Sequence, residues 1–198
     1  MKKLNLLVTG VGGQGNILAS DIISQVAIYS GYDVKKTDTL GMAQRGGSVV
    51  SNVRIARHVY SPLIKVGEVD ILLAFEKLEA ARWGHYLGNG GVAIVNNHSL
   101  PPLSVSLGSE QYPGDDRITA ILRQRTDRVY FVDGTKCARE LGNIRTLNIF
   151  MLGCVSPFLP FKLSTWKDSI VERLPPDLQE INITAFSRGR KEIQSVRL

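Results

Sequence analysis

The chain is poor in the residues that several classes of protein require. It has only two cysteines among 198 residues, and they do not form a CxxC pair. A [4Fe–4S] cluster needs four thiolates, so this chain cannot ligate one alone. Two unpaired cysteines also argue against a disulfide framework and favour a reducing compartment. No apolar run reaches the roughly 20 residues that span a bilayer, so we expect a cytoplasmic protein.

The sequence also lacks the motifs of a self-sufficient enzyme. It contains no GxSxG elbow and no P-loop, and its three histidines are isolated from other metal-binding residues. We therefore predict no catalytic residue and no metal site, which favours a subunit over a complete enzyme. Nucleic acid is a poor partner because there is no zinc-finger spacing and no basic run interleaved with aromatic residues.

Apolar and amphipathic segments alternate along the whole sequence. The predicted strands fall at residues 4–9, 32–37, 48–55, 69–75, 92–97 and 128–133, and most of them are separated by predicted helices. A polar loop at 39–47 separates the second strand from the third, and residues 58–60 are expected to pair with the third strand as a hairpin arm. This alternation predicts a single three-layer α/β/α domain over residues 1–198, with a mostly parallel or mixed sheet. The first strand, a glycine loop, a helix and the second strand form a Rossmann-like βαβ opening, and Gly31 is a plausible helix stop.

Positive charge is concentrated near the N-terminus. The formal net charge is +6, and residues 1–67 hold eight basic against three acidic side chains, a net of +5. The same segment is rich in glycine, which lets backbone N–H groups approach an anion. The composition fits either an anionic partner or a solvated basic face, and both interpretations stay open.

Gly10-x-Gly12-x-x-Gly15 has the spacing of a dinucleotide-binding loop between a strand and a helix. Its physical basis would be phosphate binding at the helix N-terminus. Asp38 lies near the position of a ribose-binding acid, although Lys35 and Lys36 stand beside it. An NAD- or FAD-binding loop, a tight turn, and another anion-binding or subunit-contact role all remain as interpretations.

Two further segments have two interpretations each. Residues 144–155 form a predicted helix that is apolar almost all round, suited to the core or to burial against a second subunit. The second interpretation predicts that the isolated chain forms a homodimer or exposes an apolar patch. Residues 98–116 are rich in proline and glycine and form either a surface loop or a partner contact.

Two motifs together resemble those of a known family. The glycine loop at residues 10–15 is followed by a second loop, Gly-Met-Ala-Gln-Arg-Gly-Gly, at residues 41–47. The pair resembles the small (beta) subunit of indolepyruvate ferredoxin oxidoreductases, which is similar to the gamma subunit of pyruvate and other 2-oxoacid:ferredoxin oxidoreductases. Residues 142–148 and 182–189 also resemble family segments, although Ile144 stands where we expect proline in many relatives. The likeness covers nearly the whole chain.

The resemblance implies a subunit of an enzyme that oxidatively decarboxylates an aryl 2-oxoacid to an acyl-coenzyme A and passes electrons to ferredoxin. Thiamine diphosphate and [4Fe–4S] clusters are expected on a large partner subunit, in an anaerobic or facultative cytoplasm. This chain is expected to hold no cofactor tightly. Two other functions compete with this one: a stand-alone NAD(P)-dependent oxidoreductase, and a non-enzymatic coenzyme A- or nucleotide-binding module.

Coenzyme A is the ligand that the two loops would contact, through its phosphates. Arg45 would pair with a phosphate and Gln44 would orient it, while glycine N–H groups would line the anion site. The predicted cofactor-binding residues are Gly10, Gly12, Gly13, Gln14, Gly15, Gln44, Arg45, Gly46 and Gly47. The alternative is that both loops only shape a buried turn that seals the active site of the large subunit.

Overall fold

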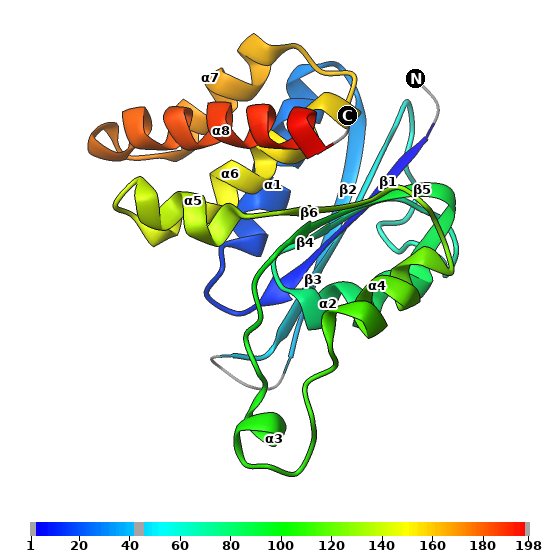
Figure 1. Cartoon of the computed structure of the whole chain (residues 1–198). Helices are drawn as coiled ribbons and strands as arrows, with labels where there is room; N and C mark the ends of the chain where they lie inside the picture. The colour runs from blue at the N-terminus through cyan, green and yellow to red at the C-terminus, as the bar shows by residue number, and fades with distance from the viewer. Residues whose placement is uncertain (1–2, 42–45, 197–198) are drawn as a thin grey trace.

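A single six-stranded sheet forms the centre of the computed structural model (Figure 1), which describes residues 3–41 and 46–196. The strands are β1 (Leu4–Val11), β2 (Asp33–Leu40), β3 (Ser48–Ala56), β4 (Val69–Ala74), β5 (Leu87–Asn96) and β6 (Val129–Val132). The α-helices are α1 (Asn16–Tyr29), α2 (Lys77–Trp83), α3 (Leu103–Ser106), α4 (Asp115–Arg123), α5 (Gly134–Glu140), α6 (Leu147–Val155), α7 (Leu163–Arg173) and α8 (Pro176–Val196). Short 3₁₀ turns span Gly84–Tyr86, Ile144–Thr146 and Ser156–Phe158.

The sheet is mixed, with strand order β2-β3-β1-β4-β5-β6. Strands β1, β4, β5 and β6 pair in parallel, whereas β3 pairs antiparallel with both β1 and β2. Strand β2 therefore points the same way as β1 but is separated from it by β3. The predicted βαβ opening is present in chain order, yet its two strands are not neighbours in the sheet.

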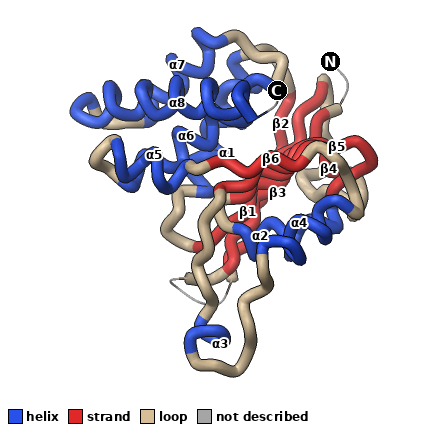
Figure 2. Tube along the Cα trace, in the orientation of Figure 1, coloured by secondary structure: helices blue, strands red, loops and turns tan. Residues whose placement is uncertain are grey.

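Helices cover both faces of the sheet, which confirms the predicted three-layer α/β/α architecture. In Figure 2, α1 and α5–α8 lie on one side of the strands, and α2 and α4 lie on the other. The alternation along β1 matches this division, since Leu6 and Val8 belong to the core beneath α1 and Leu7 belongs to the core beneath α2 and α4. Gly31, in the left-handed region just after α1, ends that helix as predicted.

Helix α6 is the central helix of the larger core. All nine of its residues are buried, and α8 lies across it. The two backbones cross so closely that a Cβ added at Gly153 would lie 2.1 Å from the Phe186 carbonyl oxygen, and one added at Gly189 would lie 2.0 Å from that of Phe150. The interpretation of residues 144–155 as a surface for a second subunit is therefore wrong, because the chain's own helix α8 covers it.

The region between β3 and β4 contains no further strand within the part of the chain that the structure describes. Residues 58–60 form a bend, and the partner of β3 on its outer side is β2. None of the described helices is both long enough and apolar enough to cross a membrane.

Candidate functional site

The chain reverses its direction of winding between β1 and β4, and we call the region outside the carboxyl ends of these two strands the crevice. Helix α1 follows β1 onto one face of the sheet, and α2 follows β4 onto the other. Ligands of open α/β sheets bind at such switch points because the loops diverge there. The glycine loop after β1 lies at this crevice.

The end of the glycine loop leads directly into helix α1. Gly15 precedes the helix with φ of 83°, and Gly13 has φ of 103°, a region that residues with side chains rarely adopt. The backbone N–H groups of Gly13 and Gly15 have no hydrogen-bond partner among the described residues. They add to the partial positive charge of the helix N-terminus, which favours an anion.

Gly10 and Gly12 have structural contacts instead. A Cβ at Gly10 would lie 2.7–2.8 Å from the side chains of Gln14, Asn16 and Phe75, so this position must be glycine for packing. The Gly12 N–H donates to the Gly47 carbonyl oxygen at 2.9 Å. The N–H groups that the loop offers to a ligand are therefore those of Gly13 and Gly15.

Gln14 ties the glycine loop to the end of β4. Its Oε1 accepts from the Val11 N–H at 2.7 Å, and its Nε2 donates to the Phe75 carbonyl at 3.1 Å. The same carbonyl accepts from Nδ2 of Asn96 at the end of β5, at 3.0 Å. The Gln14 amide is thus used within the chain, where it fixes the floor of the crevice.

The second glycine segment lies against the first. Beyond the Gly12–Gly47 bond, the Gly41 N–H donates to the Ser48 carbonyl at 2.8 Å, which closes the base of the loop between β2 and β3. Gly46 and Gly47 are therefore beside the glycine loop, as the pairing of the two motifs implied. Gln44 and Arg45 lie outside the described residues.

A pocket of about 480 Å³ opens beside the glycine loop. It is bounded by the N-terminus of α1, the loop after β5, the α5–α6 connection and the start of α8. Its lining residues are Gly13, Gln14, Gly15, Leu18, His98, Leu100, Thr135, Arg139, Asn143, Ile144, Arg145, Leu147, Asn148, Leu174, Leu178 and Asn182. Two cations, several side-chain amides and an apolar wall thus surround one cavity.

Arg139 and Arg145 give this pocket its charge. Neither guanidinium forms an ion pair with any described carboxylate, although six ion pairs occur elsewhere in this part of the chain. Burial and the neighbouring Arg139 lower the pKa of His98, so its imidazole is neutral at pH 7. The wall therefore combines two unpaired cations with an uncharged histidine, a donor set that suits phosphate.

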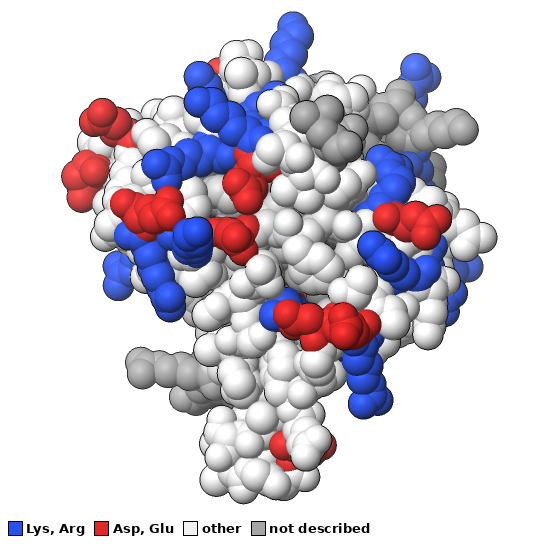
Figure 3. Space-filling view, in the orientation of Figure 1, with Lys and Arg blue, Asp and Glu red and all other residues white. Residues whose placement is uncertain are grey.

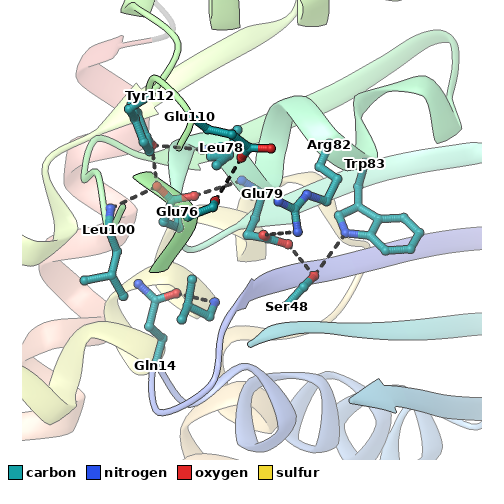
Figure 4. A network of polar contacts seen from close by, with 12 residues as sticks. Gln14, Ser48, Glu76, Leu78, Glu79, Arg82, Trp83, Leu100, Glu110 and Tyr112 are labelled. Atoms are coloured by element: carbon teal, nitrogen blue, oxygen red, sulfur yellow. Dashed lines mark hydrogen bonds and ion pairs between the residues drawn. The ribbon is translucent and has the colours of Figure 1, made fainter. Parts of the chain in front are cut away.

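A second polar network lies on the other side of the crevice (Figure 4). Glu76 is the N-cap residue of α2, and its carboxylate accepts from the Glu79 N–H at 2.8 Å, the Leu100 N–H at 3.0 Å and the Tyr112 hydroxyl. Burial and the bonded Glu76 carboxylate raise the pKa of Tyr112, so its hydroxyl stays protonated and donates. One buried carboxylate thereby holds both ends of the segment between β5 and α4.

Glu79 holds the end of the second glycine segment through a hydrogen bond with Ser48. Its Oε2 accepts from the Ser48 hydroxyl at 2.5 Å, and its Oε1 pairs with Arg82 at 3.1 Å. Burial raises the pKa of Glu79, while Ser48 and Arg82 oppose that shift. Since Ser48 directly follows Gly47, this carboxylate fixes the point where the loop enters β3.

The geometry does not favour a dinucleotide. Asp38 is paired with Lys36 at 3.0 Å and accepts from the Ser51 hydroxyl at 2.5 Å. Asp38 also lies on β2, which is not a neighbour of β1 because β3 lies between them. Since neighbouring strands are about 5 Å apart, β2 is two such spacings away from β1. In the dinucleotide-binding fold the ribose-binding acid ends the strand next to β1, so Asp38 is misplaced for that role.

Sequence reasoning missed most of the pocket wall. Arg139 and His98 belong to no recognisable motif, and only tertiary packing brings them to the glycine loop. A signal did exist for six wall residues that fall within the family-like segments 142–148 and 182–189: Asn143, Ile144, Arg145, Leu147, Asn148 and Asn182.

A ligand crevice at the switch point of a mixed sheet defines the class: an α/β subunit with a Rossmann-like, anion-accepting site. Comparison with known families specifies it further. Residues 5–192 match the model of the family described as pyruvate ferredoxin/flavodoxin oxidoreductase, and the chain belongs to this family.

Curated relatives agree over nearly the full length. The chain is 36% identical to the indolepyruvate oxidoreductase subunit IorB of Thermococcus kodakarensis, covering 96% of both chains. It is 35% identical to the IorB subunit of Archaeoglobus fulgidus, covering 98% of both. The resemblance drawn from the two loops is thus confirmed, and the chain is of the small-subunit type of this oxidoreductase family.

Solved structures share the fold. The gamma subunit of a keto/oxoacid ferredoxin oxidoreductase from Geobacter sulfurreducens has a TM-score of 0.72 at 24% identity, over 97% of this chain and 99% of that one. A 2-oxoglutarate:ferredoxin oxidoreductase from Magnetococcus marinus, solved with coenzyme A bound, has a TM-score of 0.75 at 18% identity. The match covers 98% of this chain but 32% of that one, so the same fold there is part of a larger polypeptide.

Proposed function

We propose that the chain is the small subunit of a cytoplasmic indolepyruvate-type 2-oxoacid:ferredoxin oxidoreductase. The observation that carries this proposal is the identity of 35–36% to IorB subunits over almost the whole of both chains. Relatives named for other 2-oxoacids are less similar, such as a 2-oxoglutarate synthase subunit KorC at 28% identity. The aryl 2-oxoacid is therefore the substrate class that the similarity supports best.

A larger subunit would carry the redox chemistry of this complex. Its thiamine diphosphate would supply the decarboxylation chemistry, and its iron–sulfur clusters would pass the electrons on to ferredoxin. The two cysteines of the present chain are too few for one [4Fe–4S] cluster, which supports this division. The role of the present chain is to bind and orient a ligand and to complete the complex.

The pocket beside the glycine loop fits the phosphate-bearing part of coenzyme A. The free N–H groups of Gly13 and Gly15 and the unpaired cations Arg139 and Arg145 are suitable phosphate donors. Leu18, together with Leu147 and the leucines at the start of α8, offers apolar surface beside them. The predicted site residues Gly46, Gly47, Gln44 and Arg45 would extend this site from the second loop.

Reconstitution tests the proposal. The chain is mixed with the matching large subunit, and indolepyruvate-dependent, coenzyme A-dependent reduction of ferredoxin is measured. We expect full turnover only when both chains are present. Full turnover by the large subunit alone would overturn the assignment. Coenzyme A binding by a chain that does not affect turnover would instead support the non-enzymatic binding module.

Calorimetric titration of the isolated chain distinguishes the proposed function from the remaining alternative, a stand-alone NAD(P)-dependent oxidoreductase. We expect saturable binding of coenzyme A, competed by 3′-phosphoadenosine phosphates, and no stoichiometric binding of NADH. Tight binding of NADH would revive the stand-alone dehydrogenase hypothesis despite the position of Asp38.

A further inference from the structure

The segment between β5 and α4 projects from the body of the molecule. We call residues 98–114 the arm; the short helix α3 lies at its tip (Figure 1). The arm extends beyond the carboxyl ends of the parallel strands, which is also the end of the sheet where the glycine loop lies (Figure 1). It corresponds to residues 98–116 of the sequence analysis, which were interpreted either as a surface loop or as a contact with a partner.

The arm is anchored at its two ends. The Leu100 N–H and the Tyr112 hydroxyl both donate to the buried carboxylate of Glu76. The next residue repeats this pattern, since the Lys77 N–H donates to the His98 carbonyl at 3.1 Å and the Lys77 ammonium pairs with Asp115 at 2.6 Å. These bonds hold the base of the arm to the start of α2, and Figure 4 shows those made by Glu76.

The tip of the arm is also folded on itself. The Ser104 hydroxyl donates to Glu110 at 2.9 Å, and the Ser109 hydroxyl donates to the Ser104 carbonyl at 2.7 Å. Helix α3 and these bonds give the tip a defined shape. A projection of defined shape loses little conformational entropy when it binds, which favours docking.

The surface of the arm carries exposed leucines and almost no charge. Leu103 and Leu107, four residues apart around α3, are 73% and 75% exposed, and Leu100 is exposed as well. Between His98 and Asp115 the only charged side chain is Glu110, in a chain with 21% charged residues. In Figure 3 the arm is the lower protrusion, which is mostly white apart from an acidic group, whereas the body above it carries many charged side chains. Depletion of charge with exposed apolar side chains is typical of the centre of a protein interface.

The arm is continuous with the ligand site. His98 and Leu100 at its base line the pocket beside the glycine loop. Further out, the arm forms one wall of a groove of about 490 Å³ whose other wall contains Gly46, Gly47 and Ser48. A chain that approaches the pocket at this junction would contact the arm.

We propose that the arm is a docking element that inserts the Leu103 and Leu107 side chains into an uncharged, apolar recess of the larger partner subunit. The proposal rests on the function proposed above, because the partner is the chain that carries the thiamine chemistry. It adds which surface of the small subunit makes the contact. Through Leu100 and His98, docking at the tip would also fix the wall of the ligand pocket.

The test is a charge inserted at the tip. The double variant Leu103→Asp/Leu107→Asp is compared with Leu63→Asp, a matched control at a leucine that is 65% exposed, in the connection that leads into the opposite, amino-terminal end of β4. Affinity for the large subunit is measured by titration of the full-length chains, with circular dichroism and thermal unfolding to verify the fold. We expect the arm variant to bind about 30-fold more weakly or worse, and the control to bind as the wild type does.

Coenzyme A binding to the isolated small subunit separates the two proposals. If the arm variant keeps its affinity for coenzyme A and loses the partner, the docking proposal is supported. If the wild-type small subunit does not bind coenzyme A, the assignment of the pocket is wrong, but the result for the arm is unaffected. An unchanged affinity of the arm variant for the large subunit overturns the docking proposal. A second result also overturns it: the wild type forms a homodimer, the arm variant does not, and the arm variant still forms the complex. The arm would then bind a second copy of this chain and not the larger subunit.

Discussion

The backbone N–H of Gly12 donates a hydrogen bond to the carbonyl oxygen of Gly47 at 2.9 Å. The two glycine motifs that gave the family resemblance are therefore in direct contact, although they are distant in the sequence. This contact also removes the Gly12 N–H from the ligand site. The loop N–H groups that remain free among the described residues are those of Gly13 and Gly15, which line the same pocket as Arg139 and Arg145.

Substituting Gly15 by alanine is predicted to destabilise the chain and disturb the pocket. The new Cβ would lie 2.7 Å from Nδ2 of Asn148, at a backbone φ of +83°. Gly31→Ala is the matched control, because its φ is +84° and the space around it is open. We expect a loss of about 1 kcal/mol for Gly31→Ala from the backbone alone, and about 2–3 kcal/mol for Gly15→Ala. Urea unfolding of both variants measures the difference, and equal losses would contradict the predicted clash.

The crossing of α6 and α8 is predicted to tolerate no side chain at Gly189. A Cβ there would overlap the Phe150 carbonyl, so the helices would have to separate along their whole contact. We expect Gly189→Ala to lower the free energy of unfolding by roughly 3 kcal/mol. Ser195→Ala, at an exposed position of the same helix, should change it by less than about 0.5 kcal/mol. A near-neutral result for Gly189→Ala would show that the helices can move apart without loss.

Removal of the pocket cations is predicted to weaken coenzyme A binding without loss of fold. Each charge-assisted hydrogen bond contributes about 1.5–3 kcal/mol, so Arg139→Ala and Arg145→Ala should each lower the affinity roughly 10- to 100-fold. Arg125→Ala serves as control, since that side chain follows α4 on the other face of the sheet. Calorimetric titration with coenzyme A reads out the change. Equal affinities of all three variants and the wild type would remove these arginines from the site.

Glu79 is predicted to make the stability depend on pH. Burial raises its folded-state pKa above the ordinary 4.5, so the folded chain binds the proton more strongly than the unfolded chain does. Stability from this group is therefore present at low pH and falls as the pH rises through the folded pKa. Glu79→Gln removes the titration, so its stability relative to the wild type should improve as the pH increases from 4 to 7.

The comparison for Glu79 uses denaturant unfolding at each pH, with Glu180→Gln at an exposed site on α8 as the control. We expect the difference between wild type and Glu79→Gln to change with pH and that for Glu180→Gln to change much less. A pH-independent difference for Glu79→Gln would mean that Ser48 and Arg82 fully compensate the burial.

The overall architecture was predictable because strand and helix periods are local properties of the sequence. Residues such as Leu6, Leu7 and Val8 form a short apolar run that ends at a glycine loop, which is typical of a strand buried on both faces. The order of the strands was not predictable in the same way. The insertion of β3 between β1 and β2 depends on which edges pair, and no local pattern records that choice.

The candidate site was predictable only where it depends on glycine. Positions such as Gly15 need a backbone conformation that other residues avoid, so they are visible in a sequence. Arg139 and His98 have no such constraint, and they reach the pocket through the packing of α5 and the end of β5. The anchoring of the arm was hidden for the same reason, since Glu76 and Tyr112 are joined by a contact and not by spacing.

Because α8 covers α6, the larger core can be completed only after α8 has been synthesised. Every strand of the sheet and α6 itself are synthesised before residues 176–196, which are the last helix to leave the ribosome among those described. Until then the apolar surface of α6 that faces Gly189 has nothing to cover it. A nascent chain halted before Pro176 should therefore stay bound to chaperones, and the native core should form only once translation has delivered α8.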